Sequence, residues 1–148
     1  MLTTNVFVYG TLLFPEVTST LGIYSIDPAS GKEIQLVQQK ALLNGYRRFT
    51  VRLREIGNFP AIVKAEDSVE GSVLLRFSEG SLRRLDEFEG IEDGYYSRDE
   101  VRVQVDDETI PAFAYACGEP LRPHLDGPWD AEAFRVSELA WYLQNVGR

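Results

Sequence analysis

The sequence is short of the side chains on which metal and thiol chemistry depend, because it contains one cysteine, Cys117, and one histidine, His124. A single cysteine cannot form an internal disulfide, and a single histidine cannot build a histidine-rich metal site. These two shortages argue against a disulfide scaffold, a zinc enzyme and a cysteine–histidine protease. We therefore expect a site without metal and interpret Cys117 and His124 as structural residues.

Positive charge is scarce as well, since 15 Lys and Arg stand against 23 Asp and Glu, a net charge of −8. Such a charge repels phosphate backbones and anionic lipid, so neither nucleic acid nor a membrane surface is an expected partner. The first basic residue is Lys32, and the apolar run Val6 to Phe14 is interrupted at Gly10 and stopped by Pro15. Neither a secretory signal nor a transit peptide is expected from such a start, and the run is too short for a bilayer. We expect a soluble, cytoplasmic protein with a reduced thiol.

The 148 residues predict one domain, residues 1–148, built from short apolar segments. Apolar and β-branched runs predict strands at Val6–Tyr9, Leu36–Leu43, Tyr46–Leu53, Ala61–Ala65, Val69–Phe77, Ser97–Val105 and Thr109–Ala116. Turns are predicted at Asn44-Gly45, Gly57-Asn58, Glu66-Asp67 and Asp106-Asp107. Helices are predicted at Pro15–Leu21, Ser78–Glu89 and Asp130–Asn145. Because strands and helices do not alternate, we predict an α+β fold with a mixed or barrel-like sheet rather than a doubly wound one.

The predicted helix that ends at Glu89 carries the most informative residue. With Leu82 at zero and about 100° per residue, Leu85 falls near 300° and Glu89 near 340°, so Glu89 shares the apolar face. A carboxylate is costly to bury, and the helix macrodipole disfavours it at a C-terminus. Desolvation would raise the pKa of the carboxyl toward the range of a general base. The alternative is that the helix frays before Glu89, whose side chain then points to water.

Two further segments offer groups for binding. The glycine in Tyr9-Gly10-Thr11-Leu12, at the end of the first strand, lets backbone N–H groups turn toward one point and hold an oxyanion or carboxylate. The alternative is an ordinary turn at a strand end. The segment Tyr95-Tyr96-Ser97-Arg98 offers hydroxyl donors and an arginine fork for a carboxylate. The alternative there is a pair of core aromatics beside a surface arginine.

The predicted C-terminal helix carries two aromatic residues away from its core stripe. Val136, Leu139, Ala140 and Leu143 form that stripe, whereas Phe134 and Trp141 share a different face. Either these aromatics pack against the segment 118–129, or the helix is buried on two sides, or they form a homodimer contact.

These features together resemble the gamma-glutamylcyclotransferase-like family, which includes the avirulence-induced plant proteins and the gamma-glutamylamine cyclotransferases. The resemblance rests on Val6-Phe7-Val8-Tyr9-Gly10-Thr11-Leu12, Phe59-Pro60-Ala61-Ile62-Val63, Leu85-Asp86-x-x-Glu89-Gly90, Tyr96-x-Arg98 and Trp129-Asp130-x-x-x-Phe134. It implies a small mixed β-barrel flanked by helices, with a cavity between the Tyr9 to Leu12 loop and a catalytic glutamate at Glu89. It further implies formation of 5-oxoproline from a gamma-glutamyl compound, an acyl-transfer or lyase reaction that releases an amine or amino acid.

The expected chemistry needs one acid/base group and no cofactor. Glu89 would take a proton from the α-amine of the substrate and later deliver one to the leaving nitrogen. The substrate-binding residues would be Tyr9, Gly10, Thr11, Leu12, Tyr96 and Arg98. Two other functions stay open: a non-catalytic protein of the same fold that binds a small acid, and a related amidohydrolase or acyltransferase.

Overall fold

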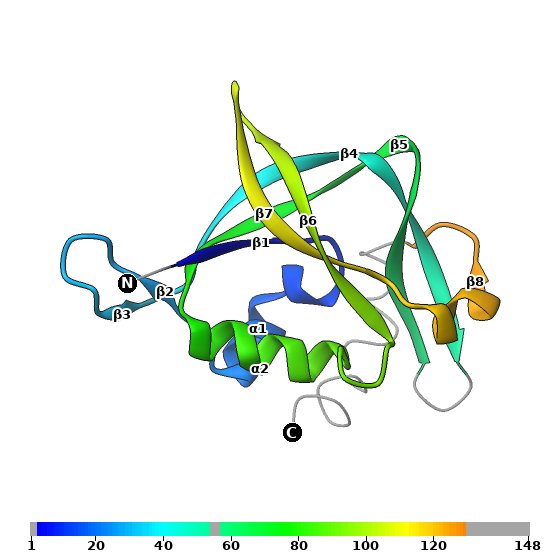
Figure 1. Ribbon diagram of the computed structural model, residues 1–148, viewed down its shortest axis with the longest axis horizontal. Helices are drawn as coiled ribbons and strands as arrows, with labels where there is room; N and C mark the ends of the chain where they lie inside the picture. The colour runs from blue at the N-terminus through cyan, green and yellow to red at the C-terminus, as the bar shows by residue number, and fades with distance from the viewer. Residues whose placement is uncertain (1–2, 54–56, 130–148) are drawn as a thin grey trace.

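The computed structural model of the protein describes residues 3–53 and 57–129 (Figure 1). Its strands are β1 (Thr4–Val8), β2 (Ser25–Ile26), β3 (Glu33–Ile34), β4 (Val37–Leu53), β5 (Gly57–Phe77), β6 (Tyr96–Val105), β7 (Glu108–Cys117) and β8 (Leu125–Asp126). Its helices are α1 (Pro15–Leu21) and α2 (Glu79–Glu89), with the 3-10 helices η1 (Thr11–Leu13) and η2 (Glu119–His124). The short strands β2, β3 and β8 are additions to the predicted elements, because two residues are too few for a periodic pattern.

The strands form one mixed sheet in the order β3-β2-β5-β1-β7-β6-β4-β8. Strand β7 runs parallel to β1 and β5, and the other pairings are antiparallel. Because β5 also pairs with β4, the pairings from β5 through β1, β7, β6 and β4 return to β5, and the sheet is strongly curved (Figure 1). The contact of β4 with β6 has one register pair, Leu42 with Gln104, so the closure falls short of a regular barrel. The predicted α+β class is confirmed.

Two pairs of predicted strands are each one long strand. Leu36–Leu43, except for Leu36 itself, and Tyr46–Leu53 are both within β4, and Ala61–Ala65 and Val69–Phe77 are both within β5. The turns predicted at Asn44-Gly45 and Glu66-Asp67 are therefore wrong. Gly45 has a φ of +89° and stands opposite residues 65–67 of β5, so β5 carries the extra residues, and the two strands keep pairing beyond this bulge. Gly57-Asn58 was also predicted as a turn and instead begins β5.

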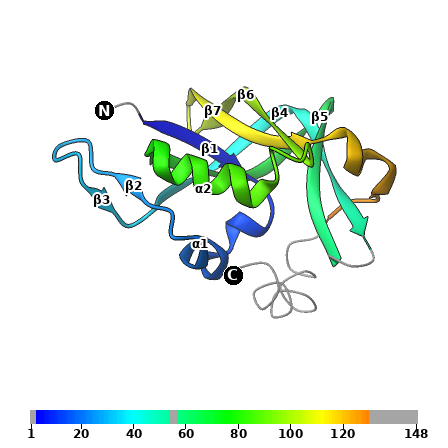
Figure 2. The same ribbon diagram turned by 60° about the horizontal axis from the view of Figure 1, so that its bottom comes forward.

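The first strand is buried on both faces, which explains its uninterrupted apolar sequence. Val6 and Val8 belong to the hydrophobic cluster that includes Val17 of α1 and Leu85 of α2. Phe7 and Tyr9 point the other way, into a second cluster inside the curved sheet. Figures 1 and 2 show both helices on one side of the sheet, so the end of β1 lies between a helical layer and the sheet interior.

Helix α2 begins and ends at the residues that the sequence predicts. The hydroxyl of Ser78 caps it by accepting a hydrogen bond from the N–H of Ser81 at 3.1 Å. Gly90 ends it in the left-handed region with a φ of +68°, and the N–H of Ile91 donates back to the carbonyl of Asp86 at 3.2 Å. The helix is therefore complete through Glu89, which rules out the alternative that it frays earlier.

The predicted C-terminal helix, Asp130–Asn145, with Phe134 and Trp141, lies outside the described residues. Its homodimer contact therefore stays a prediction. Within residues 3–53 and 57–129, no helix has the length and apolar character to cross a membrane.

Candidate active site

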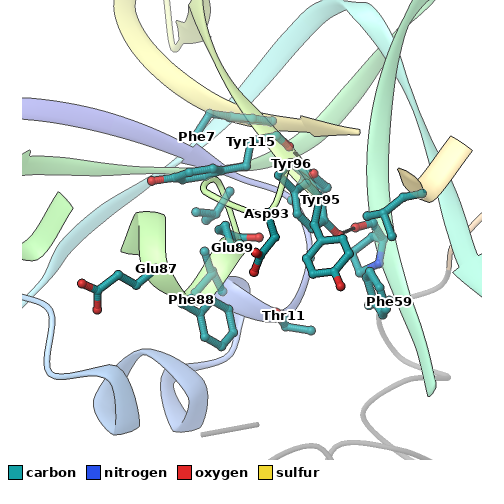
Figure 3. A pocket seen from close by; sticks show the side chains of 17 residues that line it. Phe7, Thr11, Phe59, Glu87, Phe88, Glu89, Asp93, Tyr95, Tyr96 and Tyr115 are labelled. Atoms are coloured by element: carbon teal, nitrogen blue, oxygen red, sulfur yellow. Dashed lines mark hydrogen bonds between the residues drawn. The ribbon is translucent and has the colours of Figure 1, made fainter. Parts of the chain in front are cut away.

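A cavity of about 320 Å³ opens between the end of β1, the last turn of α2 and the strands behind them (Figure 3). Three parts of the chain contribute most of its wall. The first is the β1 end and η1, the second is the turn from α2 into β6, and the third is a set of aromatic and apolar side chains from the sheet and η2. The β1 end and η1 contribute Phe7 to Leu12. The turn from α2 into β6 contributes Glu87 to Gly90, Asp93, Tyr95 and Tyr96. The sheet and η2 contribute Phe59, Pro60, Tyr115 and Leu121.

Glu89 lies in this cavity at the C-terminal end of α2. Its side chain is partly buried, and this burial, together with the charge of Asp86 one turn earlier, raises the pKa of Glu89 to about 8. Leu85, one turn before it on the same face, is fully buried. The helical periodicity therefore identified the correct face, and Glu89 is a carboxyl that exchanges its proton near neutral pH.

Asp86 connects α2 to two strands. Its Oδ1 accepts a hydrogen bond from the Tyr115 hydroxyl at 2.6 Å, and its Oδ2 accepts one from Nη1 of Arg98, also at 2.6 Å. Burial and this bond to a carboxylate raise the pKa of Tyr115 above its ordinary value. Arg98 does not line the cavity, so the structure does not bring it to the other predicted binding residues. Its fork holds Asp86 and lies over the ring of Phe113, 4.8 Å from the ring centroid.

The predicted loop Tyr9 to Leu12 forms the wall opposite α2. Gly10 has a φ of −140°, so a left-handed backbone is not the reason for glycine there. A Cβ at Gly10 would lie 2.1 Å from Cγ of Pro60, which leaves no room for any side chain. Thr11 and Leu12 begin η1, and both residues are buried.

The tyrosines of the cavity are held by bonds to the protein backbone. The hydroxyl of Tyr96 donates to the carbonyl of Pro60 at 2.8 Å, and that of Tyr9 donates to the carbonyl of Tyr115. Burial and the nearby charge of Glu89 raise the pKa of Tyr9 well above its usual value. Both hydroxyl protons are therefore already used in hydrogen bonds to the backbone. What the two side chains present to a ligand is the surface of the ring and the lone pairs of the hydroxyl oxygen. Tyr95 is exposed at the rim.

Among the lining residues that sequence reasoning missed are Asp93, Phe59 and Tyr115. Asp93 lies on the turn after α2, and Figure 3 shows its carboxylate near that of Glu89, whereas the carboxylate of Glu87 points away. Phe59 and Tyr115 enter from β5 and β7, far away in sequence. Within the described part of the chain, no group of three or more His, Cys, Asp or Glu side chains is close enough to hold a metal ion.

The fold and the cavity thus define an α+β protein with a partly buried glutamate, Glu89, in a cavity lined mainly by aromatic and apolar residues. The family model described as "Gamma-glutamyl cyclotransferase, AIG2-like" matches residues 6–131. The chain belongs to this family, and its function is cyclotransferase-like.

Individual relatives agree with this assignment. AIG2-like protein D of Arabidopsis thaliana is 31% identical over 144 residues, which cover 95% of this chain and 84% of that protein. A solution structure from Arabidopsis thaliana is 28% identical with a TM-score of 0.64, covering 97% of this chain and 79% of the other. A structure described as a gamma-glutamyl cyclotransferase is 18% identical with a TM-score of 0.65, covering 85% and 70%, and shows a shared fold.

Proposed function

We propose that the protein is a gamma-glutamyl cyclotransferase that converts a small gamma-glutamyl amine or peptide into 5-oxoproline and a free amine. The observation that carries the proposal is the carboxyl of Glu89, which has a pKa of about 8 and faces the residues 9–12 across the cavity. Membership of the cyclotransferase family supports the same reaction.

In this proposal the substrate supplies its own nucleophile. Its α-amine is protonated near neutral pH, and the carboxylate of Glu89 removes a proton so that the nitrogen can attack the γ-carbonyl carbon. The attack forms the bond between the α-nitrogen and the γ-carbon and puts negative charge on the carbonyl oxygen. Because the reaction is intramolecular, holding the substrate folded supplies much of the rate.

The attack gives a tetrahedral intermediate at the γ-carbon, and when this intermediate breaks down the leaving nitrogen receives the protons. The bond from the γ-carbon to the leaving nitrogen breaks while Glu89 delivers a proton to that nitrogen. The α-nitrogen gives up two protons in all, and the leaving nitrogen gains two when it departs as an ammonium ion. Water and cofactor are not consumed, because every proton moves between the substrate and Glu89.

The main chain at Gly10, Thr11 and Leu12 is the proposed site for the α-carboxylate or for the developing oxyanion. Backbone N–H groups are suited to either charge in a site shielded from water. Gly10, Thr11 and Leu12 line the same cavity as Glu89, which supports this assignment. The rings of Tyr9 and Tyr96 would then contact the hydrocarbon part of the gamma-glutamyl group.

The test is to incubate the protein with a panel of gamma-glutamyl amines, amino acids and peptides and to detect products by mass spectrometry. Formation of 5-oxoproline with the free amine, lost in Glu89→Gln, is the expected result. Free glutamate would identify an amidohydrolase instead. Binding without any product would identify a small-acid binding protein of the same fold.

A further inference from the structure

The carboxylate of Asp86 is held by two residues that lie side by side on different strands. Arg98 of β6 and Tyr115 of β7 are directly opposite each other in the antiparallel register, so their side chains share one face of the sheet. Each donates to a different oxygen of Asp86 at 2.6 Å. A single carboxylate therefore fixes the last turn of α2 against both strands.

The same contacts continue to the opposite wall of the cavity. The carbonyl of Tyr115 accepts a hydrogen bond from the hydroxyl of Tyr9, and Tyr9 begins the segment that faces Glu89. The side chain and main chain of Tyr115 thus link α2 to the end of β1. Asp86 and Glu89 are three residues apart on one helix, so a shift of Asp86 moves Glu89 with it.

We propose that Asp86 is a positioning residue, which uses Arg98 and Tyr115 to fix the Glu89 carboxyl relative to the segment Tyr9 to Leu12. The inference rests on the proposed function, because it concerns the same acid/base group. It assigns to Arg98 a role behind the cavity wall in place of contact with the substrate. It also explains why a partly exposed aspartate lies one turn before the titrating glutamate.

The arrangement has an electrostatic consequence with a definite sign. The negative charge of Asp86 disfavours ionisation of Glu89, so neutralising Asp86 lowers the pKa of Glu89. The positive charge of Arg98 opposes that of Asp86, so removing Arg98 raises the pKa of Glu89. These opposite shifts follow from the charges of Asp86 and Arg98, and a lower kcat in both variants is the separate sign that Glu89 is less well fixed.

Other titratable groups surround Glu89 and have to stay constant in the comparison. Among the described residues, those that line the cavity with it are Tyr9, Glu87, Asp93, Tyr95, Tyr96 and Tyr115. Arg48 lies behind Tyr9, where it lowers the pKa of that hydroxyl. None of these groups is altered in the two variants, so a shift reports on Asp86 and Arg98.

The experiment compares Asp86→Asn and Arg98→Met with the wild type. The pKa of Glu89 is followed by NMR titration of protein labelled with ¹³C-carboxyl glutamate, with the signal assigned by its loss in Glu89→Gln. We expect a decrease of about one unit in Asp86→Asn and a smaller rise in Arg98→Met. The acid limb of kcat/KM should move in the same directions, and kcat should fall about tenfold in both variants because Glu89 is less well fixed.

A matched pair of control variants is available on the surface. Arg47 and Asp67 form an ion pair of 3.0 Å with both side chains about half exposed, and neither lines the cavity. Asp67→Asn and Arg47→Met make the same chemical changes and should leave the pKa of Glu89 and kcat unchanged.

Opposite shifts of the Glu89 pKa together with a lower kcat in both variants support the proposal, whereas an unchanged kcat, or shifts in one direction or none, overturns it. If Asp86→Asn does not fold, Arg98→Met alone decides, because the proposal requires an upward shift there. The titration does not depend on turnover. A wild-type protein that forms no 5-oxoproline would overturn the proposed function, whereas the NMR result would still show whether the charges of Asp86 and Arg98 act on Glu89.

Discussion

Nη1 of Arg48, on β4, donates a 2.6 Å hydrogen bond to the carbonyl oxygen of Tyr9. The C=O and N–H of a trans peptide unit point in opposite directions, so fixing this carbonyl also fixes the N–H of Gly10 on the other side of the peptide plane. The guanidinium also lies over the ring of Trp129, 5.5 Å from its centroid. Arg48 therefore orients the main chain of the proposed anion site from behind.

We expect Arg48→Met to weaken substrate binding more than it slows turnover. The change removes the donor to Tyr9 and leaves its carbonyl free to rotate, so the N–H of Gly10 is less well directed. An increase of about tenfold in KM with a smaller change in kcat is expected, which corresponds to about 1.4 kcal/mol. Arg52→Met on the same strand is the control, because Arg52 pairs with exposed Asp126 away from the cavity. Equal effects of the two substitutions would contradict this role.

Replacing Glu89 by glutamine is expected to abolish turnover and keep the fold. Glutamine is nearly isosteric, but it cannot take the proton of the α-amine, so the rate of 5-oxoproline formation should fall about 10²-fold or more. Glu79→Gln is the matched control on the same helix, since Glu79 is exposed in the first turn and does not line the cavity. Activity of Glu89→Gln within about twofold of the wild type would refute the assignment.

The raised pKa of Glu89 predicts how activity depends on pH. The free protein must lose the proton of Glu89 before it can act as a base, and half of it has done so at a pH of about 8. We therefore expect kcat/KM to rise between pH 6 and 8 and to level off above that range. A rate that is already constant from pH 5 upward would show that a different group titrates.

The same shift predicts how stability depends on pH. Between the ordinary pKa of 4.5 and the folded value of about 8, the folded protein binds more protons at Glu89 than the unfolded chain. This contribution to stability is full below pH 4.5 and is lost as the pH rises toward 8. Glu89→Gln lacks it, so its melting temperature relative to wild type should be higher at pH 9 than at pH 5. Each kcal/mol gained corresponds to about 2–4 °C.

A residue of this site can be found from the sequence when the interactions that place it are made by residues close to it along the chain. The position of Glu89 depends on a helix whose cap at Ser78 and stop at Gly90 lie within twelve residues of one another. Periodicity therefore identifies it. Arg98 was expected to face the substrate because nothing in its neighbours reveals Asp86, which approaches only after α2 turns into β6. Tyr115 depends on the register of β6 against β7, which no local pattern specifies.

The strand errors have a comparable cause. Asn44-Gly45 has the composition of a hairpin turn, and the backbone of Gly45 does adopt the positive φ that such a turn requires. Whether this conformation reverses the chain or forms a bulge depends on the partner strand. Pairing between β4 and β5 resumes at Tyr46 with Lys64, so the strand continues. Local residue preferences therefore predict the positive φ at Gly45, but they do not predict that the strand continues after it.

The last prediction concerns the contact of Gly10 with Pro60. A Cβ at Gly10 would lie 2.1 Å from Cγ and 3.1 Å from Cδ of Pro60, but 3.4 Å from its Cβ. Gly10→Ala should therefore push η1 away from β5, lowering both the melting temperature and turnover; overpacking of this kind costs about 1–3 kcal/mol. Pro60→Ala removes Cγ and Cδ and leaves a contact of ordinary van der Waals length. The double variant should therefore regain most of the stability that Gly10→Ala loses, relative to Pro60→Ala alone, in a thermal-denaturation cycle of the four proteins. If the two substitutions are additive, the clash with Pro60 is not what requires glycine at this position.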